Sequence, residues 1–232
     1  TFECGQCFRW NADKDGAYWG IAMECPAKIW TEGELVYIKS PGSIEMWREY
    51  FDLERDYLKI SSGFDGGEYL SMCVSYGQGI RILRQEPWEA LCSFIISQCN
   101  NISRIKGIVE RLCENFGRAL EFEGRCFYTF PSAADIAALP EGALDVLRCG
   151  YRAPYISAAA LAVASGALDL SSLIDCDSAE AKRSLMALPG IGEKVANCVV
   201  LFGLYHMEAF PIDVWIRRAL KEHFPADFDP AC

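Results

Sequence analysis

The sequence predicts an α+β protein that is mostly helical, with a small N-terminal antiparallel β-sheet domain followed by a helical domain. Aromatic and β-branched residues alternate with acidic or glycine turns over residues 8–39, which is typical of an antiparallel meander. Apolar residues recur with helical spacing from Pro87 onward. Hydrophobic residues make up 51% of the 232 residues, which is enough for a sizeable core.

The predicted strands cover residues 8–10, 17–23, 28–31 and 35–39. Ser43 then caps a helix that runs to about Leu53. Further helices are expected from Pro87, from the residues after Asn101 to Gly117, from Ser132, and over residues 142–147, 151–164, 178–188, 193–204 and 213–223. We predict a sheet domain with flanking helices over residues 1–77 and a helical domain over residues 78–232, with a helical hairpin at about 178–204.

The formal net charge of −10 gives no general support for binding a polyanion, so any contact with nucleic acid must rest on local geometry. Twelve cysteines are present, and several lie in apolar helical patterns. We therefore expect buried free thiols, among them Cys73, Cys92, Cys113 and Cys198, rather than disulfides. No metal site is expected, because Cys4 and Cys7 lack further ligands with suitable spacing. No apolar run is long enough to span a membrane.

The most informative segment is Leu188-Pro189-Gly190-Ile191-Gly192, between two amphipathic helices. Its glycines permit a tight reversal and expose backbone N–H groups at the start of the second helix. These groups form an anion site without a basic side chain, which would let an acidic protein hold a DNA phosphate. The alternative interpretation is an ordinary helical hairpin with a glycine turn.

Lys194 follows in the first turn of the second helix, where the helix dipole disfavours a cation. A partly buried amine at this position would lose its proton more readily and could form a Schiff base with an electrophilic carbon. A solvated lysine beside Glu193 is the alternative. Asp213, nineteen residues later, is either a plain helix cap or a carboxylate that stabilises positive charge near the lysine.

Hairpin, lysine and aspartate in this order resemble the helix-hairpin-helix (HhH-GPD) DNA glycosylase superfamily, and more closely its 8-oxoguanine DNA glycosylase/AP lyases. The resemblance extends over nearly the whole chain. It is carried by GQCFRW (residues 5–10), RILRQEP (81–87), NNISRI (100–105), GYRA (150–153) and LPGIGEKVANC (188–198).

The resemblance implies a bifunctional glycosylase and lyase of base excision repair, acting on 8-oxoguanine in duplex DNA. Lys194 would attack C1′ of the damaged nucleotide, and Asp213 would stabilise the charge that develops as the base leaves. Gly5 would present its carbonyl to the N7 hydrogen of 8-oxoguanine, where normal guanine has a lone pair. Cys198 and Phe202 would line the pocket for the extruded base.

The same resemblance assigns a second set of residues to the DNA around the lesion. Tyr151 would wedge into the base stack, Arg104 and Arg152 would bind the unpaired cytosine, and Asn100 would support the loop that fills the gap. Gly190, Gly192 and Trp215 would lie against the backbone. The active site is expected at the domain interface, with no cofactor apart from a structural monovalent or divalent cation that the hairpin could hold.

This chain departs from the family pattern in three places. Cys99 replaces an asparagine that fills the vacated space, which puts a strict preference for cytosine in doubt. Trp215 replaces a histidine that contacts a phosphate. The family's final helix has no visible counterpart after residue 229.

Two alternatives remain at this stage. One is a glycosylase of the same superfamily for another damaged base, and the other is a non-catalytic DNA-binding module. We expect a monomer in a reducing intracellular compartment, the cytoplasm of a bacterium or the nucleus of a eukaryote, with duplex DNA as partner and no membrane.

Overall fold

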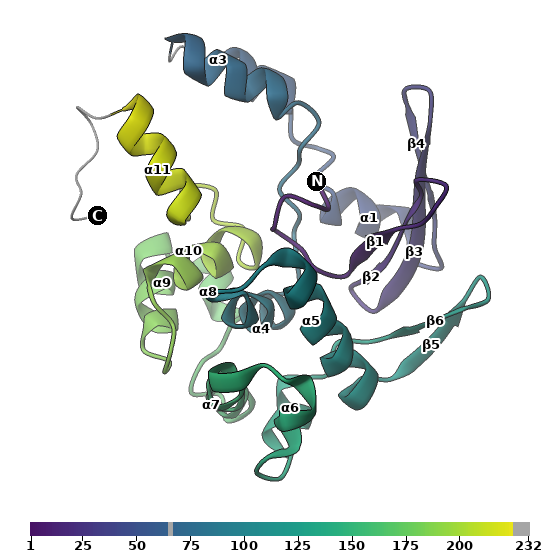
Figure 1. Ribbon diagram of the computed structural model, residues 1–232, viewed down its shortest axis with the longest axis vertical. Helices are drawn as coiled ribbons and strands as arrows, with labels where there is room; N and C mark the ends of the chain where they lie inside the picture. Colours follow the sequence, from purple (N-terminus) through teal and green to yellow (C-terminus); the bar gives the residue numbers. More distant parts are fainter. Residues whose placement is uncertain (65–66, 225–232) are drawn as a thin grey trace.

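The computed structural model describes residues 1–64 and 67–224. Figure 1 shows the N-terminal sheet at one side of the molecule and a body of helices at the other, with α3 and α11 on the periphery. The strands are β1 (Trp10–Ala12), β2 (Tyr18–Ala22), β3 (Cys25–Glu32), β4 (Leu35–Lys39), β5 (Ala119–Phe122) and β6 (Arg125–Tyr128). The predicted α+β class is confirmed.

The first three helices are α1 (Ile44–Tyr50), α2 (Tyr57–Ser62) and α3 (Gly67–Tyr76). The helical body contains α4 (Pro87–Ser97), α5 (Ile102–Phe116), α6 (Ala133–Ala137), α7 (Ala153–Ala164), α8 (Ser172–Asp175), α9 (Ser178–Met186), α10 (Glu193–Phe202) and α11 (Val214–His223). Two short 3₁₀ helices, η1 (Ala143–Leu147) and η2 (Gly150–Arg152), precede α7.

The N-terminal sheet is an antiparallel meander in the order β1-β2-β3-β4. Its register places Gly20 opposite Trp10, and the side chain of Trp10 is buried. A Cβ at Gly20 would lie 2.5 Å from the Trp10 indole, so only glycine leaves room for this ring. The strand pattern read from the sequence is therefore confirmed, with boundaries shifted by a few residues.

A second sheet was not predicted. Strands β5 and β6 pair through a two-residue turn in which Glu123 and Gly124 both have positive φ, 50° and 71°. This is the backbone of a type I′ hairpin turn. No element was predicted between Gly117 and Ser132, because the acidic residue and the glycine of the turn were not recognised as a hairpin signal.

Local capping signals located most helix starts. Asn101 and Ser132 accept hydrogen bonds from Arg104 N and Asp135 N, and Pro87 is the first residue of α4. Helix α9 begins at Ser178 as predicted, and its cap is the carboxylate of the preceding Asp177.

Helix α4 is the centre of the helical body. Its buried residues include Leu91, Ile95 and Ile96, which pack with apolar residues of α5, α7 and α10 in one core. At the C-terminal end of α10, a Cβ at Gly203 would lie 2.9 Å from Ala90 Cβ, so α10 and α4 approach closely there. The start of α4 therefore packs closely against the C-terminal end of α10.

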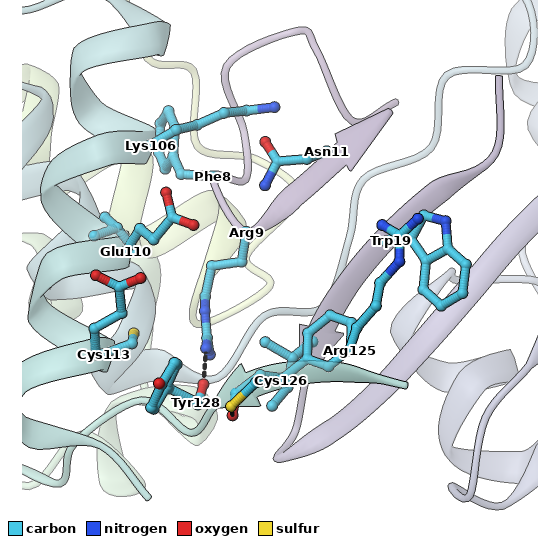
Figure 2. A pocket seen from close by; sticks show the side chains of 14 residues that line it. Phe8, Arg9, Asn11, Trp19, Lys106, Glu110, Cys113, Arg125, Cys126 and Tyr128 are labelled. Atoms are coloured by element: carbon cyan, nitrogen blue, oxygen red, sulfur yellow. Dashed lines mark hydrogen bonds between the residues drawn. The ribbon is translucent and has the colours of Figure 1, made fainter. Parts of the chain in front are cut away.

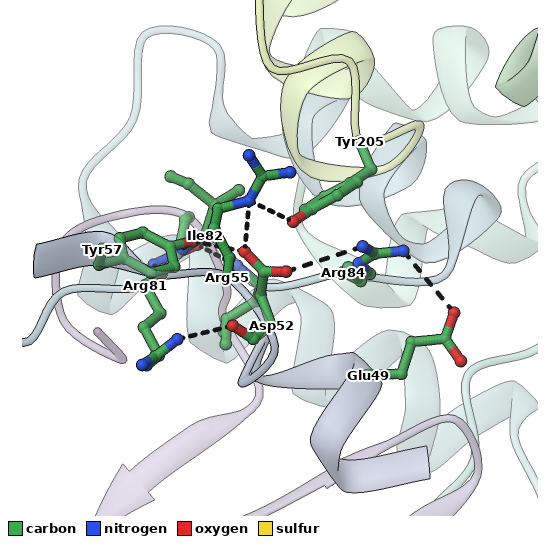
Figure 3. A network of polar contacts seen from close by, with 10 residues as sticks. Glu49, Asp52, Arg55, Tyr57, Arg81, Ile82, Arg84 and Tyr205 are labelled. Atoms are coloured by element: carbon green, nitrogen blue, oxygen red, sulfur yellow. Dashed lines mark hydrogen bonds and ion pairs between the residues drawn. The ribbon is translucent and has the colours of Figure 1, made fainter. Parts of the chain in front are cut away.

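Asp52 anchors the sheet domain to the helical body (Figure 3). Its buried carboxylate accepts hydrogen bonds from Arg55 Nε at 3.0 Å and Tyr57 Oη at 2.8 Å. Arg84 Nη2 lies 3.7 Å from the other carboxylate oxygen, and the Arg84 guanidinium stacks 3.7 Å from the Tyr205 ring centroid. The network joins the end of α1, the segment before α4 and the loop after α10.

The cysteines follow the predicted pattern with one exception. All cysteines in the described part of the chain are free thiols, and Cys92, Cys113 and Cys198 are buried. Cys73 is exposed, so its predicted burial is wrong. The reason is that α3 lies on the periphery and has no buried residue. No helix among the described residues is long and apolar enough to cross a membrane.

Candidate active site

Lys194 is half-buried in the first turn of α10. Its Nζ donates a hydrogen bond to Ser97 Oγ at 3.3 Å, and it lies 5.7 Å from the Phe94 ring centroid. Both of these residues belong to α4, the central helix. The amine is thus held between an aromatic ring and a neutral hydroxyl, and no carboxylate of residues 1–64 or 67–224 is in direct contact with it.

Glu193 does not neutralise this amine. Its carboxylate accepts a hydrogen bond from Lys182 across the hairpin, and this contact holds the pKa of Glu193 below its ordinary value. Glu193 is therefore paired with Lys182 rather than with Lys194, whose own side chain is half-buried.

Cys198 lies one turn beyond Lys194 and is buried. Burial raises the pKa of this thiol to about 11, although the nearby Lys194 amine acts to lower it. The thiol therefore stays neutral at physiological pH. Phe202 follows one turn later and stacks on Phe94, with ring centroids 5.5 Å apart. One face of α10 thus presents an amine, a neutral thiol and an aromatic ring in succession.

Asp213 is the N-cap of α11, as the sequence predicted. Its Oδ1 accepts hydrogen bonds from Trp215 N and Ile216 N, each at 2.9 Å. The negative charge of Asp213 is also close enough to raise the pKa of the Cys198 thiol. The carboxylate is therefore both a helix cap and part of the electrostatic environment of Cys198, which Lys194 contacts.

The two hairpin glycines differ in what requires them. Gly190 has φ 77°, and a Cβ there would lie 2.3 Å from the Tyr155 ring. Gly192 has φ −94°, an ordinary value, and a Cβ there would meet no atom within 4 Å. The fold therefore demands glycine at 190. At 192 glycine leaves an open surface beside the N-terminus of α10, which suits close approach of a ligand.

Several residues of the predicted site lie on the loop between α4 and α5 or form hydrogen bonds with it. The Gln98 carbonyl accepts hydrogen bonds from Arg152 Nε at 3.0 Å and from Tyr151 Oη at 3.4 Å. Asn100 folds back on the loop, donating to the Ile96 carbonyl at 3.1 Å and accepting from Asn101 N. Cys99 has φ 45°, a left-handed conformation that asparagine tolerates better than most residues.

Arg152 is buried against the loop between α4 and α5. Its side chain is 3% exposed and donates to the carbonyls of Gln98, Cys99 and Cys149. The guanidinium is thus largely occupied by backbone carbonyls, and its contact with cytosine stays a prediction. Arg104 and Trp215 are exposed, and the Trp215 ring lies 5.0 Å from the Arg218 guanidinium. Their DNA contacts stay predictions.

Gly5 has φ 83°, so its backbone conformation itself favours glycine. A Cβ at this position would contact only the end of the Ile102 side chain, at 3.8 Å. Ile102 is the first residue of α5, immediately after the loop that holds Tyr151 and Arg152. Gly5 therefore lies beside the start of α5, where the 98–101 loop ends. This loop begins directly after Ser97, which accepts the hydrogen bond from Lys194.

Sequence reasoning missed two residues of this site. Ser97 accepts a hydrogen bond from the Lys194 amine, and the Gln98 carbonyl accepts hydrogen bonds from Arg152 and Tyr151. Their only sequence signal is their position directly before Cys99 and Asn100. Their contacts come from α10 and η2, about 50 to 100 residues away.

A cavity of about 220 Å³ lies elsewhere, between the sheet, α5 and β6 (Figure 2). Arg9 reaches into this region, donating to the Tyr128 carbonyl and pairing with Glu89 at 3.2 Å. None of the predicted site residues lines this cavity. No group of three or more His, Cys, Asp or Glu residues suited to a metal occurs in the described ranges, and a cation at the hairpin stays a prediction.

A glycine hairpin between two helices, followed by a half-buried lysine and a capping aspartate, defines a helix-hairpin-helix protein. Comparison with known families agrees. Residues 1–91 match the family model "8-oxoguanine DNA glycosylase, N-terminal domain", and residues 92–231 match "HhH-GPD superfamily base excision DNA repair protein". The chain belongs to the 8-oxoguanine DNA glycosylase family of the HhH-GPD superfamily.

Among curated relatives, the N-glycosylase/DNA lyase of Saccharomyces cerevisiae is 38% identical over 159 residues, covering 63% of this chain and 42% of the yeast protein. The N-glycosylase/DNA lyase OGG1 of Arabidopsis thaliana is 37% identical over 98% of this chain and 66% of its own length. The Clostridium acetobutylicum 8-oxoguanine glycosylase/lyase, solved with DNA containing cytosine opposite 8-oxoG, has a TM-score of 0.93 and 35% identity over 99% of this chain and 81% of that chain. The chain thus spans less than two thirds of the yeast and plant relatives.

Proposed function

We propose that this protein is a bifunctional DNA glycosylase and AP lyase that extrudes 8-oxoguanine from duplex DNA and excises it. The observation that carries the proposal is the Lys194 amine, half-buried between Phe94 and the Ser97 hydroxyl at the start of α10. The membership of the chain in the 8-oxoguanine DNA glycosylase family supports 8-oxoguanine as the lesion. The fold and the lysine together support catalysis over a purely DNA-binding role.

In the proposed reaction, the Lys194 amine attacks C1′ of the damaged nucleotide while the bond from C1′ to the base nitrogen breaks. The electrons of that bond leave with the base. Positive charge develops on the sugar, and Asp213 supplies the negative charge that stabilises it. The departing base takes up the proton that Nζ releases. The C1′–O4′ bond then breaks, O4′ takes a proton from water, and a protonated Schiff base forms between Nζ and C1′. The Schiff base acidifies the C2′ hydrogens, so that loss of a C2′ proton to water expels the 3′ phosphate by β-elimination.

Gly5 is the proposed reader of the lesion. 8-Oxoguanine carries a hydrogen on N7, so a backbone carbonyl facing N7 accepts a hydrogen bond from the lesion. The same carbonyl would face a lone pair in normal guanine. The carbonyl is hydrogen-bonded in the complex with 8-oxoguanine and unpaired in the complex with guanine. This difference is worth about 1–3 kcal/mol and favours binding of the lesion.

Extrusion of a base costs a few kcal/mol and leaves a gap in the duplex. We propose that Tyr151, which is exposed beside the 98–101 loop, occupies the base stack, and that Arg104 binds the unpaired cytosine. The backbone N–H groups around Gly192 would hold a phosphate, since anions bind favourably at a helix N-terminus.

Borohydride trapping tests the proposal. A duplex with one 8-oxoguanine opposite cytosine should form a covalent adduct with the native protein and none with Lys194→Gln. Lys182→Gln is the matched control, because Lys182 is also a hairpin lysine but pairs with Glu193. An adduct that persists in Lys194→Gln would reject Lys194 as the nucleophile.

The proposal extends to the setting of the enzyme. The protein would act as a monomer in the compartment that holds the chromosome, the cytoplasm of a bacterium or the nucleus of a eukaryote. Sedimentation of the protein with and without duplex DNA tests the monomer, and a two-to-one complex on a single lesion would contradict it.

A further inference from the structure

Two buried glutamines have no part in the reaction described above. The side chains of Gln6 and Gln85 are 2% and 7% exposed. Gln6 follows Gly5 directly, and Gln85 belongs to the segment that leads into α4. Buried amides of this kind are retained where their hydrogen bonds fix a backbone in one position.

The Gln6 amide bridges two residues of the segment before α4. Its Nε2 donates to the Arg81 carbonyl at 2.8 Å, and its Oε1 accepts from Leu83 N at 2.9 Å. One side chain therefore satisfies a carbonyl and an N–H two residues apart, as a neighbouring β-strand would do. The 81–85 segment and the N-terminal segment are held together by this amide.

Gln85 forms hydrogen bonds with both Gln6 and the end of α10. Its Nε2 donates to the Gln6 backbone carbonyl at 2.6 Å. Its own backbone N donates to the Phe202 carbonyl at 3.2 Å. Phe202 is the last residue of α10, the helix that begins beside Lys194. A single residue thus connects the N-terminal segment to the end of the catalytic helix.

We propose that Gln6 and Gln85 are positioning residues for lesion recognition, which place the Gly5 carbonyl relative to the pocket on α10. This inference rests on the proposed function, because it assumes that the Gly5 carbonyl reads N7 of 8-oxoguanine. Neither glutamine touches the base. Both act through the peptide that joins Gly5 to Gln6.

The physical reason lies in peptide geometry. The Gly5 carbonyl shares a planar peptide with the nitrogen and Cα of Gln6. Gln6 is fixed through both its side chain and its carbonyl, so this peptide plane has little freedom to rotate. Glycine alone has the widest conformational range of all residues, and a Gly5 carbonyl without this restraint would sample many directions. Because hydrogen bonds weaken steeply with misalignment, discrimination of the lesion depends on this restraint.

The test compares a substrate that carries a base with one that lacks it. Gln85→Met removes the donor to Gln6 while keeping the size of the side chain. We expect single-turnover excision of 8-oxoguanine opposite cytosine to slow by roughly tenfold, the loss of about one well-aligned hydrogen bond. Borohydride trapping on a preformed abasic site opposite cytosine should keep its native rate, because no base is read there.

Two further variants separate positioning from general destabilisation. Gln85→Asn keeps the amide but is one methylene too short to reach Gln6, so it should reproduce the effect of Gln85→Met even if the latter folds poorly. Thr129→Val is the matched control, because it removes another buried side-chain hydrogen bond, from Arg118 N at 3.0 Å, that does not involve Gln6 or Gln85. It should leave the ratio of the two rates at the native value.

The possible outcomes are distinct. If excision of 8-oxoguanine and trapping at the abasic site slow equally in the two Gln85 variants, Gln85 has only a structural role and the proposal is overturned. Native rates for both reactions would overturn it as well. Failure of the native protein to react with either substrate would instead reject the proposed function.

Discussion

The amine of Lys194 donates a hydrogen bond to the hydroxyl of Ser97 at 3.3 Å, across the interface of α10 and α4. That hydroxyl donates its own proton to the Phe94 carbonyl at 2.8 Å. The oxygen lone pairs of Ser97 are therefore free to accept from Lys194. A hydroxyl orients the amine without supplying the negative charge that would favour its protonated form.

The first prediction concerns this pair. Ser97→Ala should slow borohydride trapping at an abasic site by roughly three- to tenfold, the effect of losing one neutral hydrogen bond. Ser61→Ala is the control, because Ser61 also donates to a carbonyl three residues earlier, at 3.0 Å, but is remote from Lys194. A native trapping rate in Ser97→Ala would mean that the hydroxyl does not orient the nucleophile.

The hairpin glycines give the second prediction. Gly190→Ala forces a Cβ into the Tyr155 ring at a positive φ, so we expect a fall in melting temperature together with weaker DNA binding. Gly192→Ala meets no atom of the protein and should keep the native melting temperature. Its DNA affinity should still fall, because the added methyl group lies where the phosphate approaches. Native affinity in Gly192→Ala would argue against a phosphate at this turn.

Arg152 and Arg104 provide the third prediction, since they differ in burial. Arg152→Met removes the guanidinium donors to the Gln98 and Cys99 carbonyls, so the free protein should lose about 1–3 kcal/mol of unfolding free energy. Arg104→Met removes an exposed side chain and should leave that free energy unchanged while reducing the preference for cytosine opposite the lesion. Urea unfolding without DNA measures the first effect, and excision opposite each of the four bases measures the second. Equal stability of the two variants would contradict the structural role of Arg152.

The sequence predicted what depends on neighbouring residues. Asp213 caps α11, and Lys194 lies in the first turn of α10 after two glycines, because capping and turn preferences act over a few residues. Residues that act across the fold were not foreseen. Ser97 reads as an ordinary helix end, and the contacts of Gln6 with the 81–83 segment join residues more than 70 positions apart. The burial of Arg152 was not foreseen either, because the carbonyls of Gln98, Cys99 and Cys149 that accept its hydrogen bonds come together only in the fold.

The fourth prediction concerns the pH dependence of Cys198. Its pKa is raised from the ordinary value of 9.0 to about 11, because burial disfavours the thiolate more than Lys194 stabilises it. Iodoacetamide at pH 8 should therefore modify the exposed Cys4, Cys99 and Cys126 well before Cys198. Peptide mass spectrometry after timed labelling gives the order. Early modification of Cys198 would indicate a thiolate beside Lys194.

The same shift determines how stability changes in alkali. A thiol with a raised pKa in the folded state loses its proton more easily when unfolded, so its contribution is complete below pH 9 and is lost as the pH rises toward 11. Cys198→Ala should reduce the alkaline loss of unfolding free energy over this interval by up to about 2–3 kcal/mol, the energy of a two-unit shift. Cys73→Ala, at an exposed position, should leave the slope unchanged. Parallel slopes for Cys198→Ala and the native protein would show that the Cys198 thiol is not buried as a neutral group beside the nucleophile.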